Sequence, residues 1–125
     1  MNRILIADDE PHVLRVLKMS LEREGYEVAI CANGREALDQ IKLGHPDVLI
    51  TDIQMPVMDG EELCRTISQT IPEREFLIFV LTSRTEIEHR EWTRKLDNIQ
   101  FLEKPVSIRE LTDKLAQYRF GALAG

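Results

Sequence analysis

The 125-residue sequence lacks the features that mark several specialised classes of protein. Its two cysteines, Cys31 and Cys64, form no CxxC pair and stand in or beside apolar stretches. We interpret them as small buried side chains of a reduced compartment rather than as metal ligands or redox centres. No apolar run approaches the ~18 residues of a membrane span, and the first residues do not resemble a signal peptide. We therefore expect a cytoplasmic protein.

Concentrated positive charge is also missing. The formal net charge is −6, and lysine and arginine form no block. Direct binding to nucleic acid needs a basic surface that displaces counterions, so the composition argues against it. What is present is ordinary globular composition, 43% hydrophobic and 30% charged, in a length that suits one domain. We expect residues 1–120 to form this domain and residues 121–125 to be a flexible tail or the start of a linker.

Short apolar runs alternate with segments of helical periodicity along the chain. The runs predict five strands, at residues 4–7, 26–31, 48–51, 76–81 and 99–102. Apolar positions three and four residues apart predict five helices, and three of these start at capping-box pairs: Asn33/Glu36, Thr85/Glu88 and Ser107/Glu110. Apolar strands that alternate with helices are typical of a parallel sheet covered on both faces. The predicted fold is a single α/β domain with a doubly wound, five-stranded parallel sheet.

Polar residues follow four of the five predicted strands. The first strand ends in Asp8-Asp9-Glu10, the third in Asp52, the fourth in Thr82-Ser83 and the fifth in Glu103-Lys104-Pro105. In an open parallel sheet these carboxyl ends lie along one edge, and ligands bind in the crevice at that edge. If the first and third strands are neighbours, the carboxylates of Asp8, Asp9 and Asp52 converge.

Converging carboxylates repel each other by about 4 kcal/mol per pair at ~4 Å and an effective dielectric constant of 20. A hard divalent cation relieves this repulsion, and Mg²⁺ favours one or two carboxylates with water and phosphate oxygens. Lys104 adds a cation for an anionic group, and Thr82 adds a hydroxyl donor. Taken singly, Asp9 could be a helix cap, Thr82 a turn residue and Lys104 a solvated loop residue. Together, at one edge, they indicate phosphoryl transfer.

This pattern resembles the receiver domain of two-component response regulators. The resemblance rests on Asp8-Asp9, Asp52, Thr82 and Lys104-Pro105 in this order, and on the specific segment Met55-Pro56-Val57-Met58-Asp59-Gly60. It spans roughly residues 2 to 119. The resemblance implies a flavodoxin-like fold with five helices, the strand order 2-1-3-4-5 and a cis Lys104-Pro105 peptide.

The resemblance also implies a role for each residue that handles the phosphoryl group. Asp52 would accept this group from a sensor histidine kinase, a phosphotransfer protein or a small phosphodonor. Lys104 would pair with the group, and Thr82 would move to hydrogen-bond it. Phe101 stands at the position of the aromatic switch residue, whose rotation follows the threonine. Such a domain catalyses only its own phosphorylation and dephosphorylation, so we do not expect an enzyme.

For the metal, the resemblance implies Mg²⁺. Asp9 and Asp52 would bind it directly, Asp8 would hold it mainly through water, and the backbone carbonyl of Gln54 would complete the protein ligands. Gln54 also stands at one of two positions that tune how fast water removes the phosphoryl group. Arg84 stands at the other.

The implied output surface consists of the fourth helix, the fifth strand and the fifth helix. The fourth-helix segment is polar with few apolar anchors, which predicts low local stability. Trp92 within it is either a partner contact or a packing residue. The chain departs from the family pattern at Ser83, where alanine is usual, and in residues 94–100, which lack the usual Ala-Gly pair.

Other functions fit these residues less well. A phosphatase of the haloacid dehalogenase kind needs an Asp-x-Asp motif on its first strand and a cap, and the adjacent Asp8-Asp9 pair and short loops supply neither. An acid-lined crevice repels the phosphate of a flavin. DNA binding would come from a downstream effector domain or partner. The length fits either a stand-alone protein or the receiver of a longer regulator.

Overall fold

The chain folds around a five-stranded parallel sheet. The computed structural model describes residues 3–83 and 98–124, with side chains up to residue 118. Its strands are β1 (Arg3–Ala7), β2 (Glu27–Cys31), β3 (Val48–Asp52), β4 (Leu77–Thr82) and β5 (Ile99–Glu103). All neighbouring strands pair in parallel, in the order β2-β1-β3-β4-β5. The predicted sheet and its strand order are confirmed.

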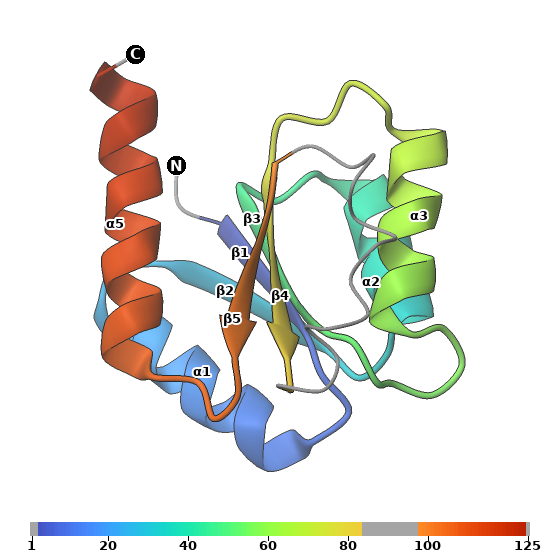
Figure 1. Ribbon diagram of the computed structural model, residues 1–125, viewed down its shortest axis with the longest axis horizontal. Coiled ribbons are helices and arrows are strands. Elements are labelled where there is room, and N and C mark those ends of the chain that lie inside the picture. Colours follow the sequence, from blue (N-terminus) through green and yellow to red (C-terminus); the bar gives the residue numbers. More distant parts are fainter. Residues whose placement is uncertain (1–2, 84–97, 125) are drawn as a thin grey trace.

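Helices cover both faces of this sheet, as Figure 1 shows. They are α1 (Pro11–Arg23), α2 (Gly34–Leu43), α3 (Gly60–Thr70) and α5 (Ile108–Ala124). The helix predicted to start near Thr85 falls within residues 84–97, so it lies outside the described residues, as do Arg84 and Trp92. No helix in the described part of the chain is both long and apolar enough to cross a lipid bilayer.

Two apolar clusters hold the layers together. On one face, Leu14, Leu17 and Leu21 of α1 and Leu111 and Leu115 of α5 pack against strand residues that include Ile6, Ile50 and Phe79. On the other face, α2 and α3 pack against a second set of strand residues that includes Leu5, Leu49 and Ile78. The central strands β3 and β4 are buried along their whole length. Burial on both faces explains why their sequences read as continuous apolar runs rather than as alternating ones.

Side-chain caps determine where three helices begin. The backbone N–H of Glu36 donates to Oδ1 of Asn33 at 2.9 Å, and the N–H of Glu110 donates to Oγ of Ser107 at 3.1 Å, as the sequence predicts. Asp59 caps α3 in the same way, at 2.8 Å from the Glu62 N–H.

Helix α5 continues to Ala124, beyond the start of the tail that the sequence predicts at residue 121. The residues Ala122-Leu123-Ala124 have high helix propensity, which offsets the ~1 kcal/mol that Gly121 costs a helix. The backbone of residues 121–124 is therefore helical. The division of the chain at residue 120 stays a prediction.

Candidate functional site

The carboxyl ends of β1 and β3 bring three carboxylates together. Ala7 of β1 pairs with Thr51 of β3, so the residues that follow them, Asp8 and Asp52, lie side by side at the end of the sheet. One carboxylate oxygen from each of Asp8, Asp9 and Asp52 lies within 4.8 Å of the other two. The convergence expected from the order of the strands is confirmed.

Asp8 is a buried acid with an unsatisfied oxygen. Its side chain is 1% exposed, and its Oδ1 accepts the backbone N–H of Glu10 at 2.9 Å. Its Oδ2 is buried without a hydrogen-bond partner, and no other buried side-chain oxygen or nitrogen of the described residues is in this position. Burial raises the pKa of Asp8 from 3.8 to about 6, opposed by the Glu10 hydrogen bond and increased by the charge of Asp52. A bound proton or a nearby cation would therefore stabilise this oxygen.

Asp9, the next residue, is exposed. The interpretation of Asp9 as a helix cap is wrong, because the cap position of α1 is Glu10 and no side chain caps this helix. Two neighbouring acids thus have different environments: Asp8 is enclosed, and Asp9 borders the open side of the site.

Lys104 forms an ion pair with Asp52. Its Nζ lies 2.6 Å from Oδ1 of Asp52, and the backbone N–H of Ile53 donates to the same oxygen at 2.8 Å. The backbone N–H of Lys104 donates to the carbonyl of Thr82 at 2.8 Å, which continues the pairing of β4 with β5 beyond the strand end. The Lys104-Pro105 peptide is cis, as the family resemblance implies. Among the residues that the structure describes, one ammonium group is thus paired with a cluster of three carboxylates, so negative charge is in excess there.

A cavity of about 730 Å³ opens beside these groups. It is lined by Asp9, Glu10, Asp52, Ile53, Gln54, Met55, Pro56, Asp59, Glu61 and Lys104. Sequence reasoning placed Asp9, Asp52, Gln54 and Lys104 at the site but missed the contribution of Glu61. Its position just after the Asp59-Gly60 pair was the available signal. The cavity has room for an ion with its waters and for a small phosphorylated molecule.

The loop from β3 to α3 is held close to Asp52 by Gly60. The N–H of Gly60 donates to the carbonyl of Ile53 at 2.7 Å. A Cβ atom at Gly60 would collide with the carbonyl oxygen of Asp52 and would lie 2.8 Å from the Cα of Ile53. Only glycine fits this close approach of two backbone segments. Gly60, the last residue of the Met-Pro-x-Met-Asp-Gly segment, therefore packs directly against the backbone of Asp52.

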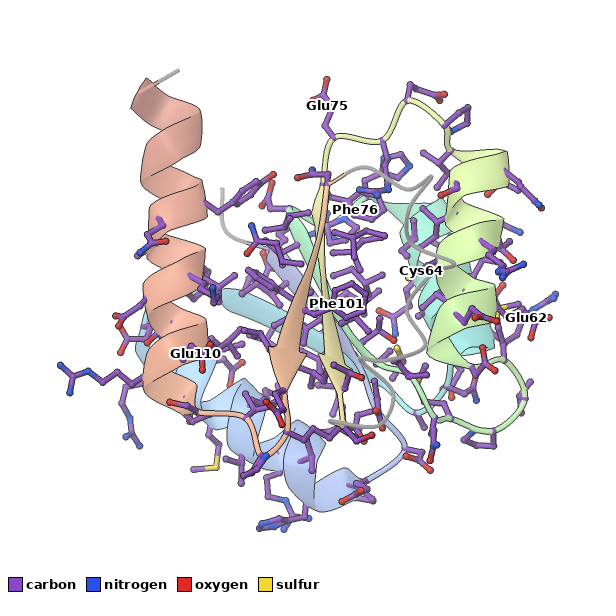
Figure 2. The ribbon with its side chains drawn as sticks, in the orientation of Figure 1. Glu62, Cys64, Glu75, Phe76, Phe101 and Glu110 are labelled. Atoms are coloured by element: carbon purple, nitrogen blue, oxygen red, sulfur yellow. The ribbon has the colours of Figure 1, made fainter. Side chains whose placement is uncertain are left out.

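Neither of the two predicted switch residues, Thr82 and Phe101, lines the cavity. Thr82 ends β4, is fully buried, and donates its hydroxyl to the carbonyl of Ser83 at 3.1 Å. Phe101 pairs with Val80 across β4 and β5 and is partly buried against the cluster under α2 and α3. Figure 2 shows Phe101 on the same side of the sheet as Cys64 of α3. Thr82 thus lies at the carboxyl end of β4 with its hydroxyl bound to the backbone, and Phe101 lies within β5, two residues before that strand ends. Their role as switch residues stays a prediction.

The two cysteines take no part in the site. Cys31 and Cys64 are buried and free, at 5% and 0% exposure. Burial raises the pKa of each thiol to about 12, so both are protonated near neutral pH. Their interpretation as small buried side chains agrees with this environment.

The chain is similar to response regulators over almost its whole length. A family model described as "Response regulator receiver domain" matches residues 4–116. The response regulator MprA of Mycolicibacterium vanbaalenii is 36% identical over 113 residues, which are 90% of this chain and 48% of that protein. The alkaline phosphatase synthesis transcriptional regulatory protein PhoP of Bacillus subtilis is 32% identical over 113 residues, 46% of its length. The chain therefore spans about half the length of these curated relatives.

Solved structures show the same likeness in three dimensions. The chemotaxis response regulator CheY4 of Vibrio cholerae superposes with a TM-score of 0.84 at 30% identity, over 94% of this chain and 98% of that one. The receiver domain of a signal transduction histidine kinase from Syntrophus aciditrophicus gives a TM-score of 0.83 at 31% identity, over 97% and 92% of the two chains.

Proposed function

The chain belongs to the receiver-domain family of two-component response regulators, and from this premise we propose that it is a phosphorylation switch with Asp52 as the phosphoacceptor. One observation carries the proposal. A buried aspartate ends a central strand, with an ammonium nitrogen 2.6 Å away and two further carboxylates within 4.8 Å. A structural ion pair would explain the lysine but not the two additional acids. An anionic, metal-assisted reaction explains both.

The residues at the site fit Mg²⁺. The donors are all oxygen atoms, three carboxylates converge, and one buried carboxylate oxygen has no hydrogen-bond donor. Asp9, Asp52 and the backbone carbonyl of Gln54 would hold the ion directly, and Asp8 would hold it mainly through water. When bound, the ion supplies positive charge that stabilises the oxygens of the transferring phosphoryl group.

The chain's own groups supply the rest of the reaction. A carboxylate oxygen of Asp52 attacks the phosphorus atom, so an O–P bond forms while the bond from phosphorus to the donor's nitrogen or oxygen breaks. The ammonium group of Lys104 binds a phosphoryl oxygen in place of the carboxylate. The hydroxyl of Thr82 leaves the Ser83 carbonyl to donate to the phosphoryl group, and Phe101 moves with it. Water later hydrolyses the acyl phosphate, so the chain changes its own state and turns over no other substrate.

The partners follow from this chemistry. A sensor histidine kinase or a phosphotransfer protein supplies the phosphoryl group in the cytoplasm, and an effector domain or a downstream protein reads the result. The output surface, which this effector or protein would contact, includes β5 and α5, together with the segment predicted as the fourth helix. The net charge of −6 opposes direct contact of this chain with nucleic acid.

Chemical labelling tests the proposal. With Mg²⁺ and acetyl phosphate, the chain should gain one phosphoryl group that hydroxylamine removes, as mass spectrometry can show. Asp52→Asn should abolish this labelling. Asp39→Asn is the matched control, because Asp39 is an exposed acid on α2 that pairs with Arg35 of its own helix, and it should label fully. Full labelling of Asp52→Asn would contradict the proposal.

A further inference from the structure

A buried hydroxyl contacts the backbone of the proposed phosphoacceptor. Thr51 is fully buried, and its Oγ1 donates to the carbonyl oxygen of Asp52 at 2.9 Å. Side chains alternate along a strand, so Thr51 shares the side of the sheet that Leu49 occupies, under α2 and α3. The remaining residues of β3 before Asp52 are Val48, Leu49 and Ile50. A hydroxyl in such an apolar layer is unfavourable unless it is hydrogen-bonded, and here the bond goes to Asp52.

The carbonyl that Thr51 binds belongs to the peptide that also holds the Asp52 side chain. A peptide unit is planar, so the carbonyl of Asp52 and the N–H of Ile53 have one common orientation. This N–H donates to Oδ1 of Asp52 at 2.8 Å, the same oxygen that Lys104 Nζ approaches at 2.6 Å. Both ends of one peptide plane are therefore held, the carbonyl by the Thr51 hydroxyl and the N–H by the carboxylate.

We infer that Thr51 is a positioning residue for phosphoryl transfer, acting through the Asp52–Ile53 peptide. Its hydroxyl fixes the direction of the Ile53 N–H. It also polarises the amide, which strengthens the hydrogen bond from that N–H to the carboxylate. The inference rests on the proposed function of Asp52. Because rates depend steeply on the orientation of the reacting groups, loss of the hydroxyl should slow the transfer step more than it weakens binding of the phosphodonor.

The space around this carbonyl is limited. Gly60 packs so close to the Asp52 carbonyl oxygen that a Cβ atom would collide with it. A valine at position 51 would fill the space of the threonine and leave no room for a replacing water molecule. The lost bond should therefore appear as a reoriented or more mobile Asp52–Ile53 peptide.

Three variants test the inference: Thr51→Val removes the donor, Thr51→Ser keeps it, and Thr70→Val is the control. Thr70 likewise donates its hydroxyl to a backbone carbonyl, that of Thr66 at 2.7 Å, but Thr70 is exposed and lies at the end of α3.

Phosphorylation rates are measured against acetyl phosphate concentration at saturating Mg²⁺. We expect Thr51→Val to lower the maximal rate about two- to ten-fold, the effect of one neutral hydrogen bond. The acetyl phosphate concentration at half-maximal rate should change less than about two-fold, because donor binding is not affected. Thr51→Ser should restore the rate, and Thr70→Val should leave it unchanged.

The Ile53 amide gives a readout that does not depend on labelling. In ¹H–¹⁵N NMR spectra its proton should move upfield in Thr51→Val, because its hydrogen bond weakens, and should stay in place in Thr70→Val. If Thr51→Val does not fold, Thr51→Cys replaces it, since a thiol is a much weaker donor. The inference is overturned if the wild type labels at Asp52 but Thr51→Val changes neither the maximal rate nor the chemical shift of the Ile53 amide proton. A wild type that does not label at Asp52 overturns the proposed function instead.

Discussion

Replacing Asp8 by asparagine should stabilise the fold when no divalent cation is present. The carboxylate is 1% exposed, lies within 4.8 Å of two others, and has an oxygen without a donor. Its pKa rises from 3.8 to about 6, which corresponds to roughly 3 kcal/mol of unfavourable free energy for the ionised form. Asparagine keeps an oxygen for the Glu10 N–H and removes the charge. We expect a gain of about 2–3 kcal/mol in the free energy of unfolding at pH 7.5.

The pH dependence identifies the cause. In the unfolded chain Asp8 loses its proton near pH 3.8, whereas in the folded chain it keeps the proton until about pH 6. Between these values the folded state binds more protons, so the contribution of Asp8 to stability falls as the pH rises through this range. Asparagine does not titrate. The advantage of Asp8→Asn should therefore be small near pH 4 and complete above pH 6.

Urea unfolding followed by circular dichroism, in buffers freed of metal ions, measures this difference at pH 4.5, 5.5 and 7.5. Saturating Mg²⁺ should reduce it at pH 7.5, because the ion stabilises the wild type more than the variant. Asp113→Asn, on the exposed side of α5, is the control and should change stability by less than about 0.5 kcal/mol at every pH. If Asp8→Asn is destabilised at pH 7.5, or if its effect is the same at all three pH values, desolvation does not govern Asp8.

Three further predictions concern the site and its loop. Val57 has a φ of 69°, which is unfavourable for a β-branched residue, and it is 79% exposed. Val57→Asn should therefore raise the free energy of unfolding by about 1 kcal/mol in the same urea experiment. A decrease would show that the loop needs the valine. Gly60→Ala should lower the free energy of unfolding by more than about 1 kcal/mol and slow labelling by acetyl phosphate, because the alanine Cβ collides with the Asp52 carbonyl. An unchanged labelling rate would mean that the loop moves without disturbing Asp52. Lys104→Met should reduce the labelling rate about 100-fold, because in the described residues it removes the only ammonium group seen on the proposed phosphoacceptor, Asp52. Lys18→Met on α1 should have no effect, and equal rates for the two variants would exclude Lys104 from the reaction.

Local patterns in the sequence determined the elements of this fold and the position of the site. Apolar runs and helical periodicity are properties of neighbouring residues, so the five strands and the caps at Asn33 and Ser107 could be predicted without coordinates. The polar residues at the strand ends located the site for the same reason, since the carboxyl ends of parallel strands share one edge. The order of the strands came from the resemblance to a family and not from the residues alone.

Only the tertiary structure decided which atoms meet. Asp8 and Asp9 are identical in chemistry and adjacent in sequence, yet one is buried with an unsatisfied oxygen and the other is exposed, because the direction in which the chain leaves β1 separates them. The meeting of Lys104 with Oδ1 of Asp52 depends on β3, β4 and β5 lying side by side. The hydrogen bond from Thr51 to the Asp52 carbonyl depends on side-chain and peptide orientations. Distances of this kind are set by packing between segments far apart in the chain, and no local pattern contains them.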